Sequence, residues 1–129
     1  MKIEFYKYHG TGNDFVIVDN RNGSIRLDEG QVNTICSRRF GVGADGLMLL
    51  EKTEGFDFKM IYFNSDGKMS SMCGNGGRCL VQFAQDIGVI KEKAHFIAID
   101  GEHDAELKDG WVHLKMNNTA MPVEKDKGY

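Results

Sequence analysis

The chain has 129 residues, enough for one domain with a hydrophobic core of its own. Its 16 basic and 19 acidic residues give a net charge of −3, so no positive excess favours nucleic acid or acidic membranes as partners. No stretch approaches the roughly 20 apolar residues that cross a bilayer. The cysteines number three, and Lys2 and Glu4 interrupt the first apolar residues, so we expect no signal segment and a reducing, cytoplasmic location.

Apolar patterns predict two strands at the beginning of the chain. Ile3 and Phe5 alternate with polar neighbours, and residues 15–18 form an apolar run of strand length. A turn is expected at Asn22–Gly23.

A helix is predicted next. Asp28 is placed to cap it, with Gln31 in the capping-box position. Arg38 and Arg39 would lie in the last turn, where basic side chains suit the negative end of a helix, and Gly41 would end it. Its apolar face would consist of Val32, Ile35 and Cys36.

The second half alternates strands with one further helix. Residues 47–50 read as a short buried strand, and alternating apolar residues predict another strand over 56–62. A helix follows from Leu80, with Gly88 as its stop. A strand is expected at 96–99. The helix has apolar residues at i, i+3, i+4 and i+7, namely Leu80, Phe83, Ala84 and Ile87.

The last predicted element is a hairpin. Asp109–Gly110 is a strong turn signal between the strand residues 105–107 and the alternating apolar residues of 112–116. Since consecutive strands usually pair, we expect an α+β domain whose sheet wraps around the helix that begins near Leu80.

Cys73 is the strongest candidate for chemistry. It lies in a glycine-rich run, residues 72–79, that opens onto this helix, where a helix N-terminus would stabilise the reactive thiolate. A free cysteine is more often a small buried hydrophobe, which is our interpretation of Cys36 and Cys79. Five residues separate Cys73 from Cys79 and the histidines are widely spaced, so we expect no metal site.

Three other glycine-rich segments would each be typical of a turn if taken alone. In order, however, HGTGNDF (9–15), GVGADG (41–46), FNSDG (63–67) and MCGNGGRC (72–79) resemble the first half of the diaminopimelate epimerases. The resemblance extends from Tyr8 to about Met121. Proline racemases and phenazine-type isomerases are less similar, and the racemases carry a histidine at the position of Asn75.

The resemblance implies a mixed or antiparallel sheet curled as a barrel around a central helix, and it assigns roles to individual residues. Cys73 would be one of two catalytic thiols. Substrate-binding residues would be Asn13, Asn64, Gly74 and Asn75. Asp14, Asp45 and Arg78 also match the family pattern, either in the site or as structural supports. Gly46 departs from it, because the family often has glutamine there.

The implied reaction interconverts LL- and meso-diaminopimelate, in lysine and peptidoglycan precursor biosynthesis. A thiolate removes the α-proton from one face and a thiol returns a proton to the other. No cofactor is required, and the family resemblance implies a homodimer of the full-length protein. A thiol is a weak base for so weak a carbon acid, so the site must stabilise the carbanionic carboxylate.

Only one such cysteine motif is present, whereas the family has two similar halves. We therefore expect residues 1–117 to form the first domain and residues 118–129 to begin the crossover to a second domain that does not follow. Three hypotheses remain: an epimerase half that is inert alone, two copies that face each other and each contribute Cys73, and a non-catalytic module that binds amino acids. A related cofactor-independent racemase or isomerase is the alternative activity.

Overall fold

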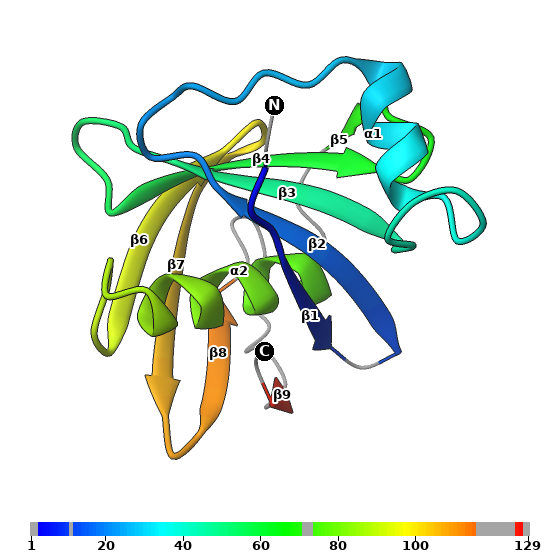
Figure 1. Cartoon of the computed structure of the whole chain (residues 1–129). Helices are drawn as coiled ribbons and strands as arrows, with labels where there is room; N and C mark the ends of the chain where they lie inside the picture. The colour runs from blue at the N-terminus through cyan, green and yellow to red at the C-terminus, as the bar shows by residue number, and fades with distance from the viewer. Residues whose placement is uncertain (1–2, 11, 71–73, 116–125, 128–129) are drawn as a thin grey trace.

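The computed structural model describes residues 3–10, 12–70, 74–115 and 126–127. Within these ranges it contains a nine-stranded sheet and two helices (Figure 1). The elements in chain order are β1 (Tyr6–Gly10), β2 (Asn13–Asp19), α1 (Glu29–Cys36), β3 (Gly46–Glu51), β4 (Phe58–Asn64), β5 (Met69–Ser70), α2 (Gly74–Asp86), β6 (Lys93–Ala98), β7 (Gly101–Lys108), β8 (Trp111–Lys115) and β9 (Asp126–Lys127).

The sheet is mixed, with the strand order β1-β2-β3-β4-β6-β7-β8-β9 and β5 paired to β4. Hairpin neighbours pair antiparallel, as expected from the sequence. Two pairs are parallel, β2 with β3 and β4 with β6, because a helix lies between the strands in each case and carries the chain back. The prediction that near neighbours pair is confirmed for every pair except β4 with β6, which are separated by β5 in the sequence.

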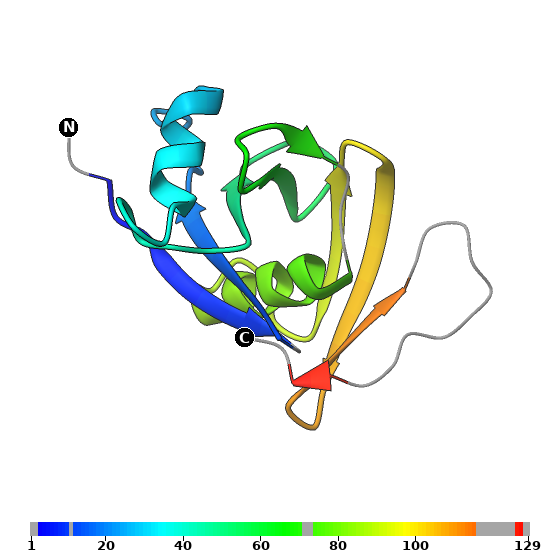
Figure 2. The same cartoon turned by 90° about the vertical axis from the view of Figure 1, so that its right-hand side faces the viewer.

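The two helices cover opposite faces of the sheet. α2 lies in the hollow of the curled sheet, with β1 and β2 on one side and β6 to β8 on the other (Figures 1 and 2). Its buried residues join the inner faces of these strands in one core, whereas α1 packs with the outer face of β2, β3 and β4 in a second core. The predicted α+β domain with a sheet curled around the central helix is therefore confirmed, in the form of a half-barrel.

The capping box of α1 is present as predicted, but the helix ends earlier than the sequence indicated. Asp28 accepts a hydrogen bond from the Gln31 backbone, and the Gln31 side chain accepts one from the Asp28 backbone. The last helical residue is Cys36, so the prediction that Arg38 and Arg39 lie in the last turn was wrong. The Ser37 hydroxyl accepts hydrogen bonds from the backbone N–H groups of Arg39 and Phe40, which favours a turn over a further helical residue.

α2 is longer than the sequence indicated, because it begins at Gly74 and not near Leu80. Gly74 and Asn75 therefore belong to the first helical turn. Gly88 follows the helix with φ +82°, as predicted for its stop.

The first strand prediction was wrong, because Ile3 and Phe5 lie outside β1, which begins at Tyr6. The other strand predictions hold with shifted ends: β4 begins two residues after Phe56, and β6 ends before Ile99. Asp109 and Gly110 have φ of 55° and 79° and join β7 to β8 in a tight turn, as predicted. The predicted domain boundary at residue 117 lies outside the described residues.

Candidate active site

The strand register places two of the predicted site residues, Asn13 and Asn64, beside Gly46 at one end of the sheet. Asn13 is the first residue of β2, Gly46 the first of β3 and Asn64 the last of β4. Gly46 pairs with Phe15 on one side and with Asn64 on the other. Because neighbouring strands lie about 4.8 Å apart, Asn13 and Asn64 flank the beginning of β3.

The beginning of α2 reaches the same end of the sheet, and a glycine allows the close approach. A Cβ atom on Gly10 of β1 would lie 3.1 Å from Cys79 Sγ and 3.6 Å from the carbonyl oxygen of Asn75. The Asn75 side chain donates from Nδ2 to Oδ1 of Asn13 at 2.7 Å. The structure thus brings together two predicted ligands that are 62 residues apart in the chain.

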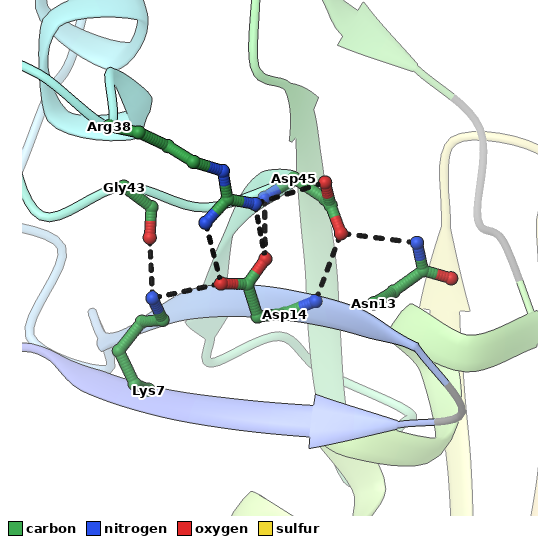
Figure 3. A network of polar contacts seen from close by, with 6 residues as sticks. All are labelled: Lys7, Asn13, Asp14, Arg38, Gly43 and Asp45. Carbon is green, nitrogen blue, oxygen red and sulfur yellow. Dashed lines mark hydrogen bonds and ion pairs between the residues drawn. The ribbon is translucent and has the colours of Figure 1, made fainter.

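Asn13 is hydrogen-bonded to a network of charged side chains formed by Lys7, Asp14, Arg38 and Asp45 (Figure 3). Asp45 Oδ2 accepts hydrogen bonds from Asn13 Nδ2 and from the Asp14 backbone N–H, both at 3.1 Å. Arg38 donates to both carboxylates, with distances of 2.9 Å to Asp14 Oδ1 and 3.2 Å to Asp45 Oδ1. Lys7 Nζ lies 3.0 Å from Asp14 Oδ2. Asp14 is therefore held by two cations, and Arg38 joins it to Asp45.

The environment of Asp14 favours its charged form. The Arg38 guanidinium hydrogen-bonds to the carboxylate and holds the pKa of Asp14 well below its usual range; Lys7 acts in the same direction, while partial burial opposes both. The same contact raises the pKa of Arg38. The Asp14 side chain is 13% exposed, so this ion pair is shielded from water on the carboxylate side.

The loop that follows α1 carries Asp45 to this network. Its backbone N–H groups close the open end of the helix: Gly41 donates to the Ser37 carbonyl, Gly43 to Ile35 and Ala44 to Cys36. A Cβ on Gly41 would lie 2.1 Å from the Thr34 carbonyl oxygen, so only glycine fits this approach. Gly41 is thus needed for packing against the helix end, whereas the sequence pattern predicted it as the helix stop.

The described cysteines are both buried, as predicted. Cys79 is inaccessible and belongs to the inner core, and Cys36 is 3% exposed in the outer core. Burial raises the pKa of the Cys36 thiol to about 11, which keeps it neutral and unreactive. Cys73 lies outside the described residues, so its predicted role stays a prediction; it immediately precedes Gly74, the first residue of α2.

Asn64 and Gly46 mark the opposite side of the candidate site. Asn64 is exposed, and within the described residues the hydrogen bonds of the Asn13 and Asn75 side chains do not include its side chain. A Cβ on Gly46 would lie 2.7 Å from Tyr62 Cε1 and 2.9 Å from the Phe63 carbonyl oxygen. A glutamine at position 46 would therefore collide with Tyr62, a residue that sequence reasoning did not single out.

Sequence reasoning also missed the contacts made by Arg38 and the bond from Asn13 to Asp45. No signal in the local pattern could have found either, because the partners are 24 and 32 residues apart.

No candidate metal site is found among the described residues. None of their His, Cys, Asp and Glu side chains form a group of three or more placed to hold a metal ion. His95 and His103 are instead bonded to Glu102 and Asp100 at 2.9 and 2.8 Å. Neither described helix has the length and apolar character needed to cross a membrane.

Several solved structures share this arrangement of helices and strands, and they identify the fold of the chain. A phenazine biosynthesis protein of the PhzF family from Bacillus anthracis superposes with a TM-score of 0.67 at 20% identity, covering 88% of this chain and 40% of that one. A hydroxyproline epimerase from Agrobacterium vitis gives a TM-score of 0.65 at 14% identity, covering 88% and 41%. The protein thus shares the fold of these proteins.

Sequence similarity is more specific than the fold. The family described as diaminopimelate epimerase matches residues 5–121, and the chain belongs to that family. The diaminopimelate epimerase of Flavobacterium psychrophilum is 52% identical over 118 residues, which cover 90% of this chain and 46% of the relative. The chain spans about half the length of the curated relatives it matches.

Proposed function

We propose that the chain is the first half of a diaminopimelate epimerase, which interconverts LL- and meso-2,6-diaminopimelate. The observation that carries this proposal is the contact between Asn13 and Asn75 at the beginning of α2, directly after Cys73, in a member of this family. Asn13, Asn64, Gly74 and Asn75 bind the α-amino and α-carboxylate groups of the substrate. Asparagine suits such a centre because its amide both donates and accepts hydrogen bonds.

Cys73 acts as one of two bases in a proton exchange that uses no cofactor. Its thiolate takes the α-proton from one face, and a thiol from the second half, absent from this chain, gives a proton to the other face. Support comes from α2, a helix of 13 residues whose N-terminal residue, Gly74, directly follows Cys73 in the sequence, since the positive end of a helix dipole stabilises a thiolate. The neutral asparagines stabilise the developing carboxylate charge without adding a full charge beside the thiol.

The remaining proposals concern the whole protein. Residues 1–117 form the first domain and residues 118–129 lead toward the second. The complete enzyme works as a homodimer in the cytoplasm and supplies lysine and peptidoglycan synthesis. The division into two halves is supported by the share of the relative's length that the chain covers, 46% for the Flavobacterium protein.

Solvent deuterium incorporation tests the proposal. LL- and meso-diaminopimelate are incubated in D2O, without cofactor, with this chain alone and with the chain plus the second half of the Flavobacterium relative. We expect incorporation at the α-carbon only when both halves are present. Incorporation by the chain alone would instead support two copies that each contribute Cys73. Absence of incorporation from a folded two-half complex would contradict the proposal.

Cysteine variants identify the base. Cys73→Ala should lower incorporation by at least about a hundredfold, the usual contribution of a positioned base. Cys36→Ala is the matched control, because this thiol is buried in the outer core. If the Cys73 variant kept normal exchange, the assignment of the base would be wrong. Binding of diaminopimelate without any exchange in the wild-type complex would favour a non-catalytic amino-acid-binding module.

A further inference from the structure

The amides of Asn13 and Asn75 lie in a chain of hydrogen bonds that runs in one direction. Arg78 Nη1 donates to Asn75 Oδ1 at 3.2 Å. Asn75 Nδ2 donates to Asn13 Oδ1 at 2.7 Å, and Asn13 Nδ2 donates to Asp45 Oδ2 at 3.1 Å. Four side chains from a helix, a strand and a loop are joined in this series, which crosses the gap between α2 and the sheet.

The two ends of the series determine its direction. An amide can be turned by 180° so that its oxygen and nitrogen exchange places, and two amides alone could bond in either sense. A guanidinium only donates hydrogen bonds and a carboxylate only accepts them. With Arg78 at one end and Asp45 at the other, Asn75 must turn its oxygen toward Arg78, and Asn13 must turn its nitrogen toward Asp45.

We propose that Asp45 and Arg78 are positioning residues that fix the orientation of the Asn13 and Asn75 amides for substrate binding. Each amide uses one N–H and one oxygen lone pair within the series, which leaves, among the described residues, one of each for a ligand. The end groups therefore determine where the remaining donors face. Their effect on substrate rests on the proposed function, since it requires these two amides to bind the α-amino acid centre.

Asp45 is itself held in place by groups outside the series. Its Oδ2 also accepts from the Asp14 N–H, and its Oδ1 accepts from Arg38. Its own N–H donates to the Asp14 carbonyl at 2.9 Å. These contacts leave the carboxylate little freedom to turn, so it can impose a single orientation on Asn13 (Figure 3).

NMR of the ¹⁵N-labelled chain tests the series without substrate. The Asn13 and Asn75 side-chain signals are assigned by their loss in Asn13→Asp and Asn75→Asp. In the wild-type chain we expect one proton of each amide to exchange at least about tenfold more slowly than those of the exposed Asn22. In Asp45→Asn the new amide can donate or accept, so protection should fall at Asn13 and also at Asn75, which Asp45 does not contact.

Two further variants make the result decisive. Asp57→Asn makes the same chemical change in a carboxylate that accepts the His95 backbone N–H at 2.7 Å, and it should leave both asparagine signals unchanged. Arg78→Gln replaces the obligatory donor at the other end of the series and should reduce the protection of the Asn13 amide. If Asp45→Asn does not fold, this variant tests the proposal in its place. Unchanged Asn75 signals in a folded Asp45→Asn chain, or unchanged Asn13 signals in Arg78→Gln, would overturn the proposal.

Binding measured with the two-half complex separates this proposal from the proposed function. Asp45→Asn should raise the Kd for LL-diaminopimelate by about tenfold, the effect of one misplaced hydrogen bond to a charged group, while Asp57→Asn should leave it unchanged. A wild-type complex that binds no diaminopimelate would contradict the proposed function and leave the NMR result standing. Normal affinity in an Asp45→Asn complex whose amides have lost protection would overturn the positioning role.

Discussion

The sheet has two regions that differ in how they are covered. β2 and β3 are buried on both faces, with Phe15 and Met48 in the inner core and Val16 and Leu47 in the outer core beneath α1. Among the described residues, β7 and β8 are covered on one face only, where Ala105, Val112 and Leu114 belong to the core around α2. Alternate positions of β7 are exposed at Glu102, Asp104 and Glu106.

This difference determines where the candidate site can be built. Asn13 and Asp14 begin β2, and Asp45 directly precedes β3, so the side chains that must be held precisely are attached to the doubly covered strands. β7 and β8 instead close the hollow around α2. We infer that substitutions which disturb both faces affect folding and site together, whereas the outer face of β7 tolerates change.

The largest expected effect is loss of packing beneath α1. Leu47→Ala should lower the free energy of unfolding by about 3 kcal/mol, because it leaves a cavity at a fully buried position. Glu106→Ala on the outer face of β7 is the control and should change it by less than about 0.5 kcal/mol. Urea unfolding of both variants measures this contrast, and equal losses would contradict the distinction between the two regions.

A smaller effect is expected from added volume at the start of β3. Gly46→Ala should cost about 2 kcal/mol, because its Cβ would lie 2.7 Å from the Tyr62 ring and 2.9 Å from a backbone oxygen of β4. Gly30→Ala is the matched control inside α1, where the added Cβ meets Asp28 at an ordinary 3.5 Å and alanine favours the helix. A Gly46→Ala chain as stable as Gly30→Ala would show that Tyr62 moves aside freely.

The coverage of the strands could be predicted from the sequence, because burial leaves a local pattern. The continuous apolar runs at 15–18 and 47–50 belong to the doubly covered strands, and the alternation at 105–107 and 112–116 belongs to the hairpin covered on one face. The cap at Asp28 and the turn at Asp109–Gly110 are also local, and both predictions were confirmed.

What could not be predicted depends on contacts between distant segments. Arg38 fits the last turn of a helix by local rules, yet Ser37 ends the helix and Arg38 pairs with Asp14 on β2. The parallel pairing of β2 with β3 brings Asp45 beside Asn13, and no sequence pattern specifies that register. Asn13 and Asn75 were found through resemblance, whereas their mutual hydrogen bond required the structure.

The ion pairs of the two regions give a third, pH-dependent contrast. At pH 7 Asp14→Asn should lower the free energy of unfolding by about 1.5 kcal/mol, a value reduced because Arg38 is 60% exposed. The folded-state pKa of Asp14 is depressed, so its stabilisation is present above the unfolded-state pKa of about 3.9 and is lost as the pH falls below it.

Urea unfolding of wild type and Asp14→Asn between pH 7 and pH 2.5 measures this dependence. The two curves should converge toward the acid end of the range. A difference that stays constant down to pH 2.5 would mean that the stabilisation is steric and does not come from the charge of Asp14.

The smallest effect is expected from the contact between His95 on β6 and Glu102 on β7. His95 Nε2 and Glu102 Oε1 are 2.9 Å apart, the same distance as Arg38 and Asp14, but their side chains are 44% and 62% exposed, whereas the Asp14 side chain is 13% exposed. Glu102→Gln should therefore change the free energy of unfolding by less than about 0.5 kcal/mol, because water screens such a pair and ordering two exposed side chains costs entropy. The hairpin keeps its stability from Val112 and Leu114, which the substitution leaves in place. Because the two distances are equal, unfolding measured beside Asp14→Asn tests whether burial sets the strength of such a contact in this protein. A loss for Glu102→Gln as large as that for Asp14→Asn would mean that burial does not decide, and the contrast between the two regions would not extend to their polar contacts.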